Sequence, residues 1–112
     1  MEQILISKII NGEFAVSPED GKAVYELIYD QIKKKNKVDL DFTGIDIMTT
    51  AFLNNAIGAL YKNFSGEELN RYLSMSNISD SDLALVKKAI DRAKITFTNE
   101  TKQEIREEFE DE

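Results

Sequence analysis

Residues 37–42 read Lys-Val-Asp-Leu-Asp-Phe and alternate strictly between charged and apolar side chains. Successive side chains of a β-strand point to opposite faces of the sheet, so this stretch predicts a strand with one apolar face and one charged face. Parallel sheets that are covered by helices on both sides have strands that are apolar on both faces. The alternation therefore predicts an α/β domain whose helices pack on one face of the sheet.

A helix is expected shortly after this strand. Thr43-Gly44 turns the chain, and either Thr49 or Thr50 can cap a new helix with its hydroxyl group. Gly58, inside the helix, is expected to allow another backbone to approach closely. Ser65-Gly66 ends the pattern. The apolar stripe of this helix has helical spacing and consists of Phe52, Leu53, Ala56, Ile57, Leu60, Tyr61 and Phe64.

Turn and helix signals also precede the strand. Asn11-Gly12 separates two apolar runs, residues 4–10 and 13–16, and this pattern predicts an N-terminal β-hairpin with a type I′ turn. Ser17-Pro18 then opens a helix that should run to about Lys35, because Ser can cap it and Pro suits its first position. The apolar residues expected on one face of this helix are Val24, Leu27, Ile28 and Ile32.

The C-terminal half continues with a short helical turn over residues 67–71, a strand around residues 72–77 and a helix that opens at residues 79–82. No internal repeat or linker divides the chain. We therefore expect one domain over residues 1–97, followed by an acidic helix or tail over residues 98–112.

Charge is concentrated in that tail. The chain has a net charge of −7, and residues 98–112 contain seven acids and only two bases. The only basic cluster, within residues 33–37, falls where a helix should end, so it can complement the helix dipole. Without a basic stripe, nucleic acid is not expected as a partner. Ile105 and Phe109 could lie on one side of a helix over residues 99–109 and dock onto the domain or onto a second copy.

Composition also limits the chemistry. The chain has no Cys and no His, so the commonest general base and the commonest soft nucleophile are missing. Asp39 and Asp41 lie about 7 Å apart on one face of the predicted strand and could offer oxygen ligands to Mg²⁺. Carboxylates are ordinary on a solvated sheet face, however. We predict no catalytic residue, no metal and no cofactor.

The expected location is the cytoplasm. Glu2 follows Met1 directly, with no basic segment before the first apolar run. The apolar runs are too short to span a bilayer. We therefore expect a protein without a leader that does not associate with a membrane.

Several stretches resemble the STAS-like domains of unknown function, a family of small bacterial and phage proteins. They are Asp-Phe-Thr-Gly-Ile over residues 41–45, Thr-Ala-Phe-Leu-Asn-Asn-Ala-Ile-Gly-Ala-Leu-Tyr over residues 50–61, and Ser-Asp-Ser-Asp-Leu over residues 79–83, with Ala-Ile and Arg-Ala shortly after. The resemblance extends over residues 38–97. It implies a STAS-type fold, a mixed β-sheet with helices packed on one face.

The resemblance also implies a function. STAS domains related to anti-anti-sigma factors bind a kinase-like ATPase, and phosphorylation of a Ser or Thr where a strand meets a helix switches the binding. Thr50 lies at the position of that residue. Thr49 stands where STAS domains have an Asp, and Phe52 stands where they have a Gly. The two threonines are therefore the candidate phosphoacceptors, and helix capping alone remains the alternative for both.

Three further residues near this junction are candidates for partner binding. Asp46 precedes the junction, and Asn54 and Asn55 interrupt the apolar helix that follows it. The two asparagines either face solvent or bond a neighbouring loop. We interpret the chain as a regulatory protein-interaction module rather than an enzyme, with an ATPase or kinase-like partner. The alternative is a small acidic inhibitor or nucleic-acid mimic that acts through its charged tail.

Overall fold

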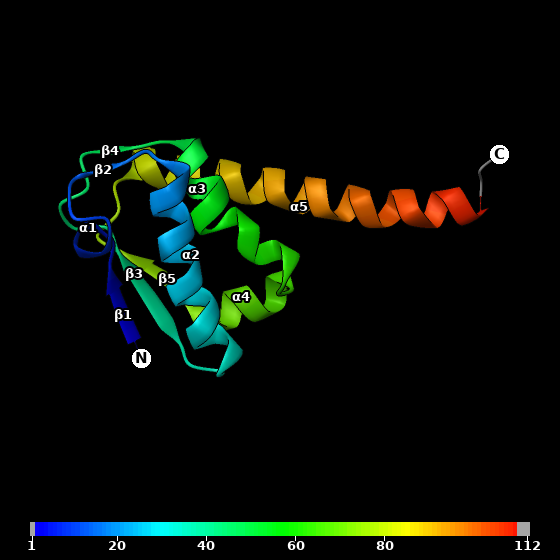
Figure 1. Cartoon of the computed structure of the whole chain (residues 1–112), viewed down its shortest axis with the longest axis horizontal. Coiled ribbons are helices and arrows are strands. Elements are labelled where there is room, and N and C mark those ends of the chain that lie inside the picture. The colour runs from blue at the N-terminus through cyan, green and yellow to red at the C-terminus, as the bar shows by residue number, and fades with distance from the viewer. Residues whose placement is uncertain (1, 110–112) are drawn as a thin grey trace.

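The computed structural model describes the backbone of residues 2–109 and the side chains of residues 2–95. Strands and helices are interspersed along the chain (Figure 1). The strands are β1 (Glu2–Leu5), β2 (Phe14–Ala15), β3 (Val38–Asp41), β4 (Ile47–Met48) and β5 (Leu73–Ser76). The helices are α1 (Ile6–Ile9), α2 (Pro18–Lys33), α3 (Thr50–Ala56), the 3₁₀-helix η1 (Gly58–Lys62), α4 (Gly66–Tyr72) and α5 (Asp80–Phe109).

The strands form two separate sheets. The larger has the order β1-β3-β5 and the smaller joins β2 to β4. All of these described pairs are parallel, so the prediction of a mixed sheet is wrong for this part of the chain. Helices lie between consecutive strands of the larger sheet and return the chain to the same end each time, which is the connection that parallel strands need.

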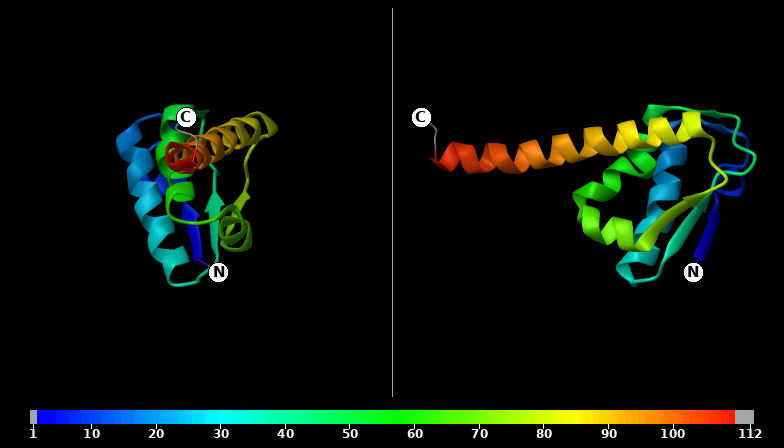
Figure 2. Two further views of the ribbon diagram at one scale, coloured as in Figure 1. Left: turned by 90° about the vertical axis from the view of Figure 1, so that its right-hand side faces the viewer. Right: turned by 180° about the vertical axis from the view of Figure 1, so that it is seen from behind.

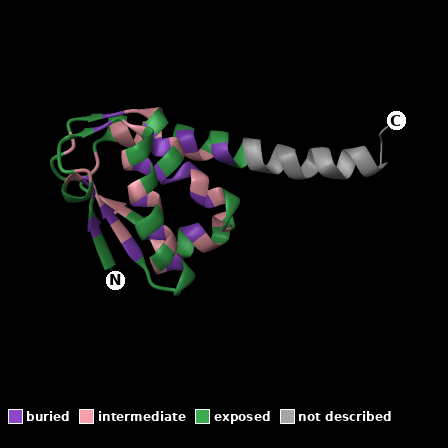
Figure 3. Cartoon of the chain, viewed as in Figure 1, coloured by how far each residue is buried: buried purple, intermediate pink, exposed green. Residues whose placement is uncertain are grey.

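The larger sheet has one covered face, as the alternation in β3 predicts. Val38 and Leu40 are completely buried and Phe42 is 3% exposed, whereas Asp39 and Asp41 are only partly buried. Figure 3 shows this change between buried and intermediate residues along β3. Helices α2 and α3 lie together on the same side of β1 and β3 (Figure 2, left). The predicted α/β fold with helices on one face of the sheet is therefore confirmed.

The predicted N-terminal hairpin is wrong. β1 pairs with β3, and β2 pairs with β4, so the two segments do not pair with each other. Asn11 does adopt a positive φ, of 58°, but it ends α1: the N–H of Gly12 donates to the carbonyl of Ser7 at 3.0 Å. This bond and the left-handed Asn are the marks of a Schellman motif. This kind of helix end and a type I′ turn both require a residue with positive φ, so the same Asn-Gly pair is suited to either.

Helix α2 begins as predicted and buries a narrower face. The Ser17 hydroxyl accepts a hydrogen bond from the N–H of Asp20 at 3.0 Å. The buried residues of this face are Val24, Ile28 and Ile32, but Leu27 is 40% exposed. Leu27 is rotated by about 100° around the helix from Ile28, and this places it outside the core.

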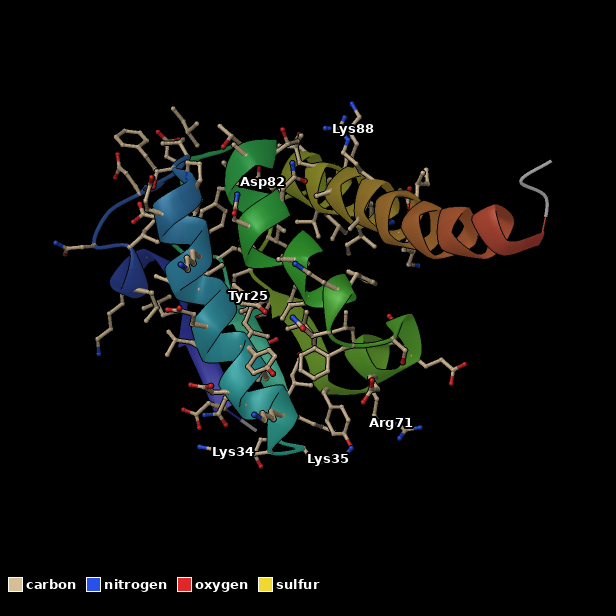
Figure 4. The ribbon with its side chains drawn as sticks, turned by 45° about the vertical axis from the view of Figure 1, so that its right-hand side comes forward. Tyr25, Lys34, Lys35, Arg71, Asp82 and Lys88 are labelled. Atoms are coloured by element: carbon tan, nitrogen blue, oxygen red, sulfur yellow. The ribbon has the colours of Figure 1, made fainter. Side chains whose placement is uncertain are left out.

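The C-terminal end of α2 carries the basic cluster. The helix ends at Lys33, and Lys34 and Lys35 follow at its lower end in Figure 4, where their side chains extend from the surface. Lysines at this end complement the negative pole of the helix dipole, as the sequence predicts.

Helix α3 crosses α2 at Gly21. A Cβ atom on Gly21 would lie 2.5 Å from the Phe52 carbonyl oxygen and 2.9 Å from the Cβ of Asn55. A Cβ on Gly58 would lie 3.5 Å from the Cβ of Ala93, which is an ordinary contact distance. The Ala89 carbonyl oxygen of α5 lies 3.8 Å from that position, so the α5 backbone does approach Gly58 as expected, but the closer backbone approach is at Gly21.

Helix α5 begins against α3 and η1 and continues beyond the body of the domain to Phe109 (Figures 1 and 2). Ala93 is still buried, whereas Ile95 is 60% exposed. The predicted docking of Ile105 and Phe109 lies outside the residues whose side chains are described. Within residues 2–109, no helix has an apolar stretch long enough to cross a membrane.

Candidate functional site

The small parallel sheet of β2 and β4, here called the ribbon, leads into two helices. Asp46 donates its backbone N–H to the Glu13 carbonyl at 2.8 Å, and Thr49 donates its N–H to the Ala15 carbonyl at 3.1 Å. Since β2 precedes α2 and β4 precedes α3, both helices begin at the same end of the ribbon (Figure 1). The strand-to-helix junction of α3 is thus held to that of α2.

Apolar side chains are exposed on the ribbon. Phe14 and Ile47 are paired across the two strands, and they are 50% and 49% exposed. Their neighbours Ala15 and Met48 are also paired, and they are buried in the core. Val16, which follows β2, is 39% exposed. We call Phe14, Val16 and Ile47 the ribbon patch, because exposed apolar groups that gather in one place are typical of interaction sites.

Thr49 is the cap of α3. Its hydroxyl accepts a hydrogen bond from the N–H of Phe52 at 3.3 Å and donates one to the carbonyl of Val16 at 3.1 Å. The second bond ties the start of α3 to the ribbon patch. The Thr49 hydroxyl therefore has a structural role both as an acceptor and as a donor.

Thr50 is the first residue of α3 and is partly exposed. The hydrogen bonds found among the described side chains include none from its hydroxyl. Of the two candidate phosphoacceptors, Thr50 is thus the one whose hydroxyl is not used to hold the junction together.

The three candidate partner-binding residues lie around the same junction. Asp46 is exposed directly before β4, and Asn54 and Asn55 are one turn further along α3 than Thr50. Asn55 donates its side-chain amide to the Ala51 carbonyl at 2.9 Å, so this amide bonds its own helix rather than a neighbouring loop. Asn54 is partly buried. Asp46 and the two threonines share the junction, while the asparagines flank it.

The uncovered face of the larger sheet is polar. Asp39 accepts hydrogen bonds from two hydroxyls of β5, from Ser74 at 2.8 Å and from Ser76 at 2.6 Å. These bonds join β3 to β5 on the face away from the helices. The cross-strand network gives this carboxylate a structural function.

Asp41 is bonded at the end of the same strand. It accepts from the hydroxyl of Thr43 at 2.6 Å and from the amide of Asn77 at 3.0 Å. These two bonds, with Thr43 the larger effect, hold the pKa of Asp41 below its usual value, because they favour the charged form. Within the described residues, no three Asp or Glu side chains converge as ligands of one metal ion would.

Sequence reasoning missed the ribbon patch. The runs Phe14-Ala-Val16 and Ile47-Met48 are continuously apolar, so they carry no alternation that would show which side chains face solvent. Exposure became visible only through the pairing of β2 with β4. The signal that identifies the site is therefore the combination of these exposed apolar side chains with the candidate threonines at the same strand-to-helix junction.

The parallel strands and one-sided helices define the class of protein, a small α/β domain whose sheet has one open face. The sequence model of the STAS-like domain of unknown function matches residues 20–83, more than half of the chain. The protein therefore belongs to this family, and the predicted resemblance is confirmed. No curated protein and no solved structure matches the chain. The matched range contains Asp46, Thr49 and Thr50.

Proposed function

We propose that this domain is a regulatory protein-interaction module that docks through the ribbon patch onto an ATPase or kinase-like protein. The observation that carries the proposal is the exposure of Phe14, Val16 and Ile47 beside the start of α3. Burying such side chains against a partner removes apolar surface from water and stabilises the complex. The class of partner rests on the resemblance to STAS domains.

Phosphorylation of Thr50 is the proposed switch. A phosphate adds a charge of about −1.5 to −2 and three strong acceptor oxygens. Thr50 follows Thr49, whose hydroxyl bonds Val16 of the ribbon patch, so the charge would arise at the border of the apolar surface. Removing that charge from water on docking is costly, and phosphorylation should therefore release the partner.

We expect Ile47→Glu to weaken partner binding by about tenfold or more, because it places an unpaired charge in the centre of the ribbon patch. The partner is first isolated from the native host and identified by mass spectrometry. Its affinity for each purified variant is then measured by calorimetry. Ile95→Glu is the matched control, since Ile95 is also exposed but lies on α5. Equal losses in both variants would contradict docking at the ribbon.

We expect Thr50→Glu to impair binding of the same partner and Thr50→Ala to preserve it. Both variants should fold, because the hydroxyl of Thr49 provides the cap of α3 and a Glu in the first helical turn is favourable. Circular dichroism checks the fold and calorimetry measures the affinity. If all three forms bind equally, Thr50 is not a switch.

Salt separates this proposal from action as an acidic inhibitor or nucleic-acid mimic. Docking through apolar side chains should change little in affinity as ionic strength rises. A surface that mimics nucleic acid should lose affinity steeply, because salt screens its charges. A steep loss of affinity with rising salt would mean that the partner binds the acidic tail and not the ribbon patch.

A further inference from the structure

Strand β1 is an open edge of the larger sheet. It pairs with β3 only, among the described strands. The N–H of Glu2 donates to the Lys37 carbonyl at 2.8 Å, so the backbone groups of Glu2 and Ile4 face β3. In a parallel ladder the intervening residues, Gln3 and Leu5, turn their backbone N–H groups to the opposite side. These donors are available to another strand.

A groove of about 390 Å³ runs beside this edge, where β1 and α1 meet α2. Its apolar lining is formed by Ile4, Leu5, Ile9 and Leu27. Leu5, Ile9 and Leu27 are 36%, 37% and 40% exposed, although they lie next to a buried core. Leu27 is also the residue of the predicted apolar face of α2 that the core does not use. An apolar groove beside free backbone donors has both parts of a strand-docking site.

Two opposite charges border the groove, Glu2 at the start of β1 and Lys8 beyond its end. A neighbouring strand that runs antiparallel and has this same sequence would bring its Lys8 toward Glu2 and its Glu2 toward Lys8. A twofold axis repeats every such contact, so the apolar centre and both charged ends become self-complementary. A strand of unrelated sequence offers no such match.

We propose that the β1 edge and its groove bind a second copy of this chain, with the two β1 strands antiparallel about a twofold axis near Ile4. Gln3 of each copy then lies opposite Leu5 of the other, and their outward backbone groups form the new ladder. The apolar side chains Leu5, Ile9 and Leu27 are covered at the same time. The two three-stranded sheets become continuous across the axis.

The first test is the solution mass of the full-length protein, measured by sedimentation equilibrium over a wide range of concentrations without any partner. We expect a concentration-dependent dimer. Leu27→Glu should raise its dissociation constant by about tenfold or more, because it places a charge in the apolar groove. Val16→Glu is the matched control, since Val16 is 39% exposed but lies on the ribbon, and it should leave the dimer unchanged.

Further variants test the strand pairing and the charges at its ends. Gln3→Pro removes the outward N–H of β1 without removing a bond to β3, so it should weaken the dimer while circular dichroism stays native. Glu2→Lys and Lys8→Glu should each weaken the dimer, and the two together should restore it, because the charges then match again across the axis.

A monomer at all concentrations would overturn the proposal. So would a dimer that Leu27→Glu leaves intact, or one that Val16→Glu disrupts equally, because the interface would then lie elsewhere. If the chain is monomeric and Leu27→Glu instead weakens binding of the isolated protein partner, the groove belongs to that partner and not to a second copy.

Discussion

Phe42→Ala is expected to lower the free energy of unfolding by about 3–5 kcal/mol, the range for truncating a large buried aromatic side chain. Phe42 is 3% exposed and belongs to the single hydrophobic core cluster of the described residues. It follows β3 directly, and its ring is packed among the other buried side chains of that cluster. Truncation to Ala would leave a cavity, and the surrounding strands and helices, which pack against one another, can close it only partly. Urea unfolding monitored by circular dichroism measures the loss.

Asp41→Asn is the control for this prediction, because Asp41 is the preceding residue and faces the other side of the sheet. Its carboxylate accepts hydrogen bonds from Thr43 and Asn77, and an Asn keeps one oxygen that can accept such bonds. The change in unfolding free energy should be far smaller than for Phe42→Ala. If the two substitutions proved equally costly, the sheet would not have one covered and one open face.

Gly21→Ala is expected to lower the free energy of unfolding by about 2 kcal/mol. The new Cβ would lie 2.5 Å from the carbonyl oxygen of Phe52, and a backbone atom cannot move aside as a flexible side chain can. Overpacking of this kind costs up to roughly 3 kcal/mol, and the better helix propensity of Ala offsets about 1 kcal/mol of that cost. Thermal and urea unfolding of the variant measure the net effect.

Two other glycines of the chain, Gly12 and Gly58, provide matched controls. Gly12→Ala should be neutral or slightly stabilising, because nothing lies within 4 Å of the new Cβ and the φ of Gly12 is outside the left-handed region. Gly58→Ala meets the Ala93 side chain at an ordinary contact distance and should cost little. A Gly21→Ala variant as stable as Gly12→Ala would mean that α2 and α3 cross further apart.

Local signals predicted the features that depend only on neighbouring residues. The alternation over residues 37–42 identified the covered face of β3, since the period of two follows from strand geometry alone. Ser17 and Thr49 cap the helices for which their hydroxyls were selected, because a cap bonds an amide only three residues away. The same capping signal marked the helix start at Thr49 and Thr50, and the resemblance to STAS domains made them the candidate phosphoacceptors.

The hairpin shows where local signals stop. A positive φ at Asn11 serves a type I′ turn and a helix end equally well, so residues 11–12 could not decide between them. Contacts with distant residues select the helix end. Ile6 is only 1% exposed because it packs in the core, and β2 pairs with β4, more than thirty residues away.

By itself, the sequence determined the α/β class, the one-sided sheet, the helix caps and the strand-to-helix junction at Thr49 and Thr50, because each depends on the chemistry of a few adjacent residues. Only the tertiary structure decided the parallel pairing, the close crossing at Gly21, and the exposure of the ribbon patch and of Leu27. For a continuously apolar run such as residues 14–16, and for Leu27 at the margin of the α2 face, burial depends on which distant element packs against the side chain, and the local pattern does not contain that information.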